Sequence, residues 1–222
     1  MSEATQTQTQ TLEQTLNRTD FGHLIFEYRK VMFALIAAVL VAVMGFSLWK
    51  QSQKSQAEAV SAKVYQFQSQ TWSSVKEGKL ASTELPKLFD ALDQDVKSAP
   101  IMIPLALEMG KFLHDKGQFV EAELILSKIN AVHPIGQFFV SSQRAIILEK
   151  LNKIPEAIAV LELAAKNKEA LMAAKLNLEL GRLNLLNGEK AKAKTHFEYI
   201  LSTYPNDDMA KLAKLYMGKM NP

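Results

Sequence analysis

The chain has 222 residues, 48% of them hydrophobic and 22% charged, which is the balance of an ordinary folded protein with a core. Its net charge of +3 is too small to predict nucleic-acid binding. The absence of cysteine excludes disulfides, thiolate nucleophiles and cysteine-bound zinc.

The first part of the chain is strongly polar. Residues 1–20 include the sequence TQTQTQT and hold too few apolar side chains to offset the entropy lost on ordering. We therefore expect a disordered polar N-terminus over residues 1–28.

The next segment predicts a transmembrane helix over residues 29–50. Val31–Trp49 holds 19 residues without a charge, and such a helix is about 28 Å long, close to the hydrocarbon core of a bilayer. Tyr28 and Trp49 stand where interfacial aromatic residues are found. A cleaved signal peptide fits badly, because its charged leader would be 30 residues long. A buried core helix is the other explanation, although such helices are rarely apolar on every side.

Charge alone does not orient this segment in a membrane. Adjacent Arg29 and Lys30 favour a cytoplasmic N-terminus slightly, but each flank holds three basic residues. These are Arg18, Arg29 and Lys30 before the segment, and Lys50, Lys54 and Lys63 after it.

Residues 51–100 predict an amphipathic helix pair. In the first helix apolar residues recur at spacings of three and four, and the helix ends near Gly78. The second helix carries Pro86 in its first turn and ends at residues 98–100. The two apolar stripes are Ala57, Val60, Val64, Phe67 and Thr71, followed by Trp72 and Val75, and then Leu85, Leu88, Phe89, Leu92 and Val96.

From Ile103 onward the sequence repeats. Two copies share the spacing of two glycines, an alanine, a large apolar residue and a proline, and they start 71 residues apart. That is about twice the 34-residue period of a tetratricopeptide repeat. A middle copy fits between them, with an asparagine in place of the second glycine. The matched positions are Gly110, Gly117, Ala122, Leu126 and Pro134; Ala145, Asn152, Ala157 and Leu161; and Gly181, Gly188, Ala193, Phe197 and Pro205.

On these positions residues 103–206 resemble three tetratricopeptide repeats. The small residues let paired helices approach closely, and the large ones fill the groove between them. The usual aromatic at the start of each repeat is replaced by Ala106, Ser141 and Asn177. The resemblance implies an all-α protein, in which a tetratricopeptide-like α-solenoid of antiparallel helix pairs follows one transmembrane helix. Residues 101–222 would hold the repeats and a C-terminal capping helix.

The whole layout is similar to the ancillary Sec translocon subunit family of the bacterial inner membrane. That resemblance rests on a polar N-terminus, one span and a degenerate repeat domain, without a short signature of its own. It implies a single-pass inner-membrane protein whose C-terminal domain is periplasmic. It further implies a role in handing secreted chains to periplasmic chaperones, with translocon subunits, chaperones or secreted clients as partners.

The sequence predicts no enzyme, no cofactor and no metal site. No two of the four histidines are three to five residues apart, and no phosphate-binding or nucleophile motif is present. His114 is expected near a helix end, where a positive charge is favourable. We expect Asp93 and Asp95 to be solvated surface charges, and Asp207 and Asp208 to form the N-cap region of the last helix.

The repeats favour protein binding through the first helix of each pair. An alternative is a homo-oligomerising scaffold of a membrane complex that binds no client. The mixture of apolar and basic side chains on the predicted concave face suits a peptide with some acidic character. The residues of this face are Leu107, Lys111, His114, Phe139, Ile146, Lys175, Leu178, Arg182 and Leu185.

Overall fold

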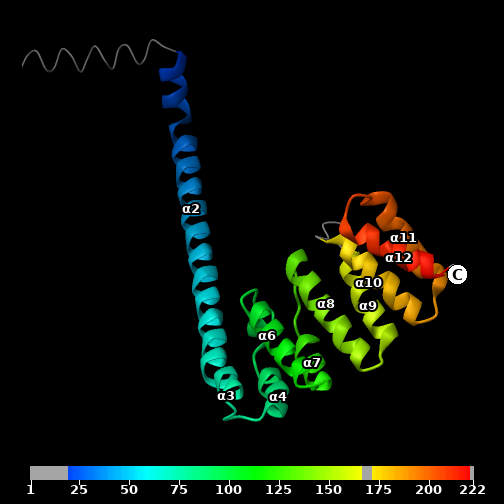
Figure 1. Ribbon diagram of the computed structural model, residues 1–222. Coiled ribbons are helices and arrows are strands. Elements are labelled where there is room, and N and C mark those ends of the chain that lie inside the picture. The colour runs from blue at the N-terminus through cyan, green and yellow to red at the C-terminus, as the bar shows by residue number, and fades with distance from the viewer. Residues whose placement is uncertain (1–19, 167–171, 221–222) are drawn as a thin grey trace, which may run out of the picture. The chain divides into compact units, whose positions relative to one another are not determined.

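The computed structural model describes residues 20–166 and 172–220, and every regular element in these ranges is a helix (Figure 1). The first helix, α2 (Asp20–Gln66), begins earlier than the predicted span. Residues 20–28 are therefore helical, where a disordered segment had been expected. The rest of that predicted N-terminus, residues 1–19, lies outside the described residues.

Residues up to Glu58 form one unit of the chain, and Ala59–Pro222 form a second. In the first unit the apolar side chains from Val31 to Trp49 are exposed on all sides of α2. By length and composition this is the one candidate membrane span among the described residues. Such a helix fits either a single membrane span or a signal sequence.

The long helix changes its winding where it enters the core of the second unit. α2 continues without a break into the π-helix η1 (Phe67–Trp72) and then α3 (Ser73–Lys76). The Ser73 N–H donates to the Gln68 carbonyl, five residues back, as a π-helix requires.

This change of winding corrects the predicted apolar stripe. In an α-helix Trp72 would lie about 140° around the axis from Phe67. The wider π turns bring the two rings to one face, and both are buried, whereas Thr71 is only half-buried. Burying a Trp instead of a Thr gains on the order of 2–3 kcal/mol of apolar transfer free energy. This gain offsets the less favourable hydrogen-bond geometry of the π-helix.

The predicted second helix of residues 51–100 is instead a broken one. A short 3₁₀ turn, η2 (Ser82–Glu84), leads into α4 (Leu85–Asp90), and α5 (Gln94–Lys97) follows after an extended residue at Asp93. A side-chain contact bridges the break. Lys97 is buried, and its Nζ donates to the Asp90 carbonyl at the end of α4, at 2.9 Å.

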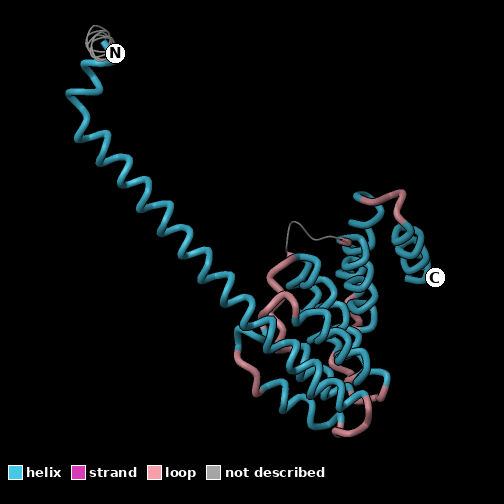
Figure 2. The backbone as a smooth tube through the Cα atoms, turned by 90° about the vertical axis from the view of Figure 1, so that its left-hand side faces the viewer, coloured by secondary structure: helices cyan, strands magenta, loops and turns pink. Residues whose placement is uncertain are grey.

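The remaining helices contact their neighbours in chain order, in antiparallel-like pairs (Figures 1 and 2). The loops between paired helices are short, which places consecutive helices side by side. The pairs are α6 (Met102–Asp115) with α7 (Phe119–Leu126), α8 (Pro134–Lys150) with α9 (Ile154–Ala165), and α10 (Ala173–Leu186) with α11 (Lys190–Thr203).

Close approach within each pair depends on the small residues of the repeated pattern. A Cβ added to Gly110 would lie 2.8 Å from Leu126 Cδ1, and one added to Gly181 would overlap the ring of Phe197. The turns inside the pairs use left-handed residues at Gly117, Asn152 and Gly188, with φ of 74°, 59° and 81°. Asn152 therefore takes the conformation that the two glycines take, as its place in the repeat predicts.

The last helix, α12 (Asp208–Met220), lies against α10 and α11. Its Ala210 and Ala213 are buried, and the ring of Tyr216 stacks on Phe197 with centroids 5.4 Å apart. Asp207 Oδ1 accepts a hydrogen bond from the Met209 N–H at 2.8 Å, which caps the start of the helix.

Candidate functional site

A surface groove of about 550 Å³ lies between α6 and α8 of the second unit. We call it the α6–α8 groove. It is the place where five of the nine predicted binding residues meet. Its lining residues are Leu107, Glu108, Lys111, His114 and Asp115 from α6, and Phe139, Ser142, Gln143 and Ile146 from α8.

The groove exists because a hydrogen bond and a glycine fix the spacing of its two walls. Gln143 on α8 donates from Nε2 to the Leu107 carbonyl on α6 at 3.1 Å. A Cβ on Gly110 would lie only 3.2 Å from that same amide nitrogen. Gly110 therefore lets α8 approach α6 closely at Gln143. The larger side chains on either side keep the two helices apart and leave the groove open.

The α8 wall is apolar and accessible. Phe139 is 49% exposed and Ile146 is 48% exposed, and seven residues of helix place them on one face about 10 Å apart. The ring of Phe139 is fixed edge-on against buried Phe138, with centroids 5.2 Å apart. Two large, half-exposed apolar side chains beside a groove form an accessible apolar surface.

The α6 wall is charged, but its charges are matched. Lys111 Nζ lies 2.6 Å from Asp115 Oδ2, and Lys76 Nζ lies 3.2 Å from Glu108 Oε1. The hydrogen bond from Lys111, followed by that from His114, holds the pKa of Asp115 below its ordinary value. The α6 wall therefore presents paired charges rather than a free cation.

His114 closes this wall near the end of α6. Its Nδ1 lies 3.4 Å from Asp115 Oδ1, and its ring meets Phe119 edge-on at 5.3 Å. Its Nε2 is buried without a hydrogen-bond partner among the described residues. The ring is held by α7 as much as by α6, so His114 fixes the groove wall rather than reaching out of it.

No family model and no curated protein matches the chain.

The four other predicted residues lie on α10, outside this groove. Lys175 Nζ stands 5.8 Å from the ring centroid of Phe138. Leu178 is buried in the core formed with Phe197, and Leu185 packs on that core. All nine residues lie on α6, α8 or α10, the first helices of the pairs. The sequence did not reveal which of them face the core.

Arg182 is a structural residue in this fold. Its guanidinium makes a two-pronged contact with Glu149 on α8, at 2.9 and 2.6 Å, and a third contact with Glu179 at 2.9 Å. These hydrogen bonds, led by the one to Glu149, raise the pKa of Arg182 and lower that of Glu149. The contact ties α10 to α8, so the cation is not available to a ligand.

Four groove residues were not predicted. Glu108, Asp115, Ser142 and Gln143 each adjoin a predicted residue or lie four positions from one, so the helical period could have found them. The hydrogen bond of Gln143 to the α6 backbone, however, depends on the packing of α6 against α8 and has no sequence signature.

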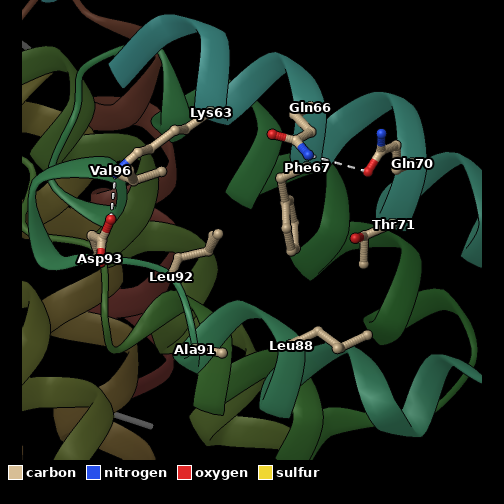
Figure 3. A pocket seen from close by; sticks show the side chains of 10 residues that line it. All are labelled: Lys63, Gln66, Phe67, Gln70, Thr71, Leu88, Ala91, Leu92, Asp93 and Val96. Atoms are coloured by element: carbon tan, nitrogen blue, oxygen red, sulfur yellow. Dashed lines mark hydrogen bonds and ion pairs between the residues drawn. The ribbon is translucent and has the colours of Figure 1, made fainter. Parts of the chain in front are cut away.

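A second hollow of about 400 Å³ lies between the π-helix and the α4–α5 segment (Figure 3). Phe67 points into it from the helix, and Leu88 and Leu92 lie opposite. Lys63 Nζ and Asp93 Oδ2, 2.5 Å apart, close one end. The hydrogen bond from Lys63 lowers the pKa of Asp93. Asp93 is thus an exposed charge, as the sequence predicts, and it also has an ion-pair partner.

Neither hollow has the groups of a metal site. Among residues 20–166 and 172–220 no three His, Asp or Glu side chains lie close enough to hold an ion. The α6–α8 groove, with two accessible apolar anchors, has the chemistry of a surface that contacts another polypeptide.

Proposed function

We propose that this chain is a membrane-anchored protein-interaction module that binds a polypeptide partner in the α6–α8 groove. The observation that carries the proposal is the half-exposed pair Phe139 and Ile146 beside a wall of matched charges. Large apolar anchors surrounded by polar groups are typical of binding hot spots. The apolar helix of the first unit would serve as the anchor.

The repeats support a tetratricopeptide-type solenoid. The three left-handed turn residues 117, 152 and 188 recur at intervals of 35 and 36, close to the repeat period of about 34. Such solenoids bind peptides on the surface lined by the first helix of each pair, and α6 and α8 are first helices.

We further propose a bacterial inner-membrane location with the second unit in the periplasm, in a complex ancillary to the Sec translocon. The support is the similarity of layout described above. In this role the groove would receive secreted chains or periplasmic chaperones. Because Lys111 and Arg182 are both paired internally, apolar contact should contribute more to affinity than attraction to an acidic ligand.

Topology is the first test. The chain lacks cysteine, so a single cysteine introduced at exposed Leu163 on α9 reports the location of the second unit. Labelling by a membrane-impermeant thiol reagent in intact spheroplasts is expected. Labelling only after lysis would place the unit in the cytoplasm and end the translocon proposal.

The groove is tested by photocrosslinking in native membranes. A photoreactive residue at Phe139 is expected to give polypeptide adducts, and the same residue at Leu163, which is 62% exposed, is the matched control. Phe139→Asp or Ile146→Asp should weaken binding at least tenfold, because each removes an apolar anchor at little cost to the core. Lys111→Glu should weaken it less. Adducts only between copies of this chain would favour the homo-oligomeric scaffold instead.

A further inference from the structure

The helix α12 has one face buried and one face open to solvent. Its buried side, formed by Ala210, Ala213 and Tyr216, lies against α10 and α11. Because the Tyr216 ring stacks flat on Phe197, the helix cannot rotate about its axis without breaking that contact. The opposite face therefore points outward in a fixed orientation.

The outward face combines lysines with leucines. At about 100° per residue, Lys211, Leu215 and Lys219 follow one another around this face, with Lys214 on one side and Leu212 on the other. Leu215 is 55% exposed and Leu212 is 41% exposed. The apolar side chains thus lie between or beside cations on an accessible helix surface.

The positive charge of this face is only partly compensated. Lys211 Nζ lies 2.8 Å from Asp208, the one acidic residue of α12. Lys214 and Lys219 make no ion pair with any residue that the structure describes. A face with two unmatched cations and two leucines is complementary to a surface that is anionic outside and apolar beneath.

From this arrangement we infer that α12 is a peripheral contact for an anionic lipid surface. Leu212 and Leu215 would enter the boundary between headgroups and acyl chains, and the lysine stems are long enough to keep their ammonium groups at headgroup level. An acidic protein would match the charge, but it would leave the central leucine facing a charged surface. The lipid surface matches both the charge and the apolar centre.

The energetics suit a reversible contact. A lysine near an anionic membrane changes binding about fivefold, so two free lysines contribute about 30-fold. Two leucines add a shallow apolar contact, which is too little for stable binding by a free domain. A chain with its own membrane anchor needs no more, because the anchor supplies a high local concentration of lipid. In this respect the inference rests on the proposed anchoring, although not on the α6–α8 groove.

The test uses the full-length chain in lipid nanodiscs. A single cysteine replaces Leu215, carries an environment-sensitive NBD fluorophore, and is compared in phosphatidylcholine discs with and without phosphatidylglycerol. Fluorescence is expected to increase and move to shorter wavelength only in the anionic discs. Leu163→Cys on α9 is the matched control and should not respond in either disc, since Leu163 is at least as exposed as Leu215 but lies on another helix.

Charge variants decide whether the lysines recognise the lipid. In the Leu215→Cys background, the double change Lys214→Gln and Lys219→Gln should lower the ratio of lipid-contacting to lipid-free α12 about 30-fold. Lys211→Gln alone should lower this ratio less. All three lysines are exposed, so an unchanged circular dichroism spectrum is expected. Phe139→Asp, which removes the proposed groove function, should leave the signal intact, so the two proposals fail separately.

Four results would overturn the inference. These are an equal response in neutral discs, no response in anionic discs, a response that needs two copies of the chain in one disc, and the same response to soluble poly-glutamate without anionic lipid. The third result would make α12 a self-association surface, and the fourth would make it a contact for acidic proteins.

Discussion

Replacing Gly181 by alanine should destabilise the second unit, although alanine is the better helix former. Gly181 lies inside α10, where alanine would ordinarily gain about 1 kcal/mol. Here the new methyl group would lie 2.7 Å from Phe197 Cζ and 2.8 Å from its Cδ1, well inside contact distance. The ring of Phe197 is fully buried, and one of its faces is stacked on Tyr216. Moving the ring would therefore disturb packed neighbours, Tyr216 among them.

Overpacking of this kind costs about 1–3 kcal/mol, and the required shift passes through Phe197 to α12. After the gain in helix propensity of about 1 kcal/mol, we expect a net loss of up to about 2 kcal/mol. For a protein of this size that lowers the midpoint of thermal unfolding by up to roughly 8 °C. Gly218→Ala is the matched control, because a Cβ there meets nothing within 4 Å, and it should be neutral or slightly stabilising.

The assay is thermal and urea unfolding of the purified full-length chain, followed by circular dichroism. Adding Phe197→Leu to Gly181→Ala should restore part of the loss, so that the double variant is more stable than the sum of the single effects. If Gly181→Ala matched Gly218→Ala in stability, the close approach of α10 to α11 would not depend on glycine. The packing argument would then be wrong.

Three further outcomes follow from the same structure. Deleting Gln70 should convert η1 into regular α-helix with Phe67 and Trp72 still on one face. The free energy of unfolding measured in urea should then change by less than about 1 kcal/mol. Loss of the fold would contradict this account of the π-helix. Asn152→Gly should be neutral or stabilising by up to about 1 kcal/mol, whereas Asn152→Val should destabilise by about 1–2, because φ there is 59°. Glu149→Gln should cost about 1 kcal/mol at pH 7. Hydrogen bonds from Arg182 hold the pKa of Glu149 below its ordinary value of 4.5. The cost should therefore be constant above pH 4.5 and shrink as the pH falls through the lowered pKa. A cost that did not shrink on acidification would refute the ion-pair explanation.

Much of the helical organisation could be predicted from the sequence because it is encoded locally. The spacing of Gly110, Ala145 and Gly181 marked the first helices of the pairs, and their partner positions marked the second helices. Asn152 was expected to replace a turn glycine, and its backbone has the left-handed conformation. These features depend on short-range periodicity and on the conformational limits of single residues.

The candidate site was predicted less completely, since burial and pairing are properties of the assembled unit. Arg182 and Leu178 share the periodicity of Leu107 and Ile146, yet one is tied to Glu149 and the other is in the core. Nothing in the local sequence separates them. The separation depends on which helix packs next to which.

The sequence by itself determined the all-helical class, the apolar segment that could span a membrane, and the places where paired helices come close. Tertiary structure alone decided that Trp72 is buried through a π-helix rather than Thr71, that Arg182 bonds to a residue 33 positions away, and that Phe139 stays exposed beside α6. The physical reason is that backbone preference acts within a few residues. Burial and ion pairing are settled only when distant helices compete for the same space and the same partners.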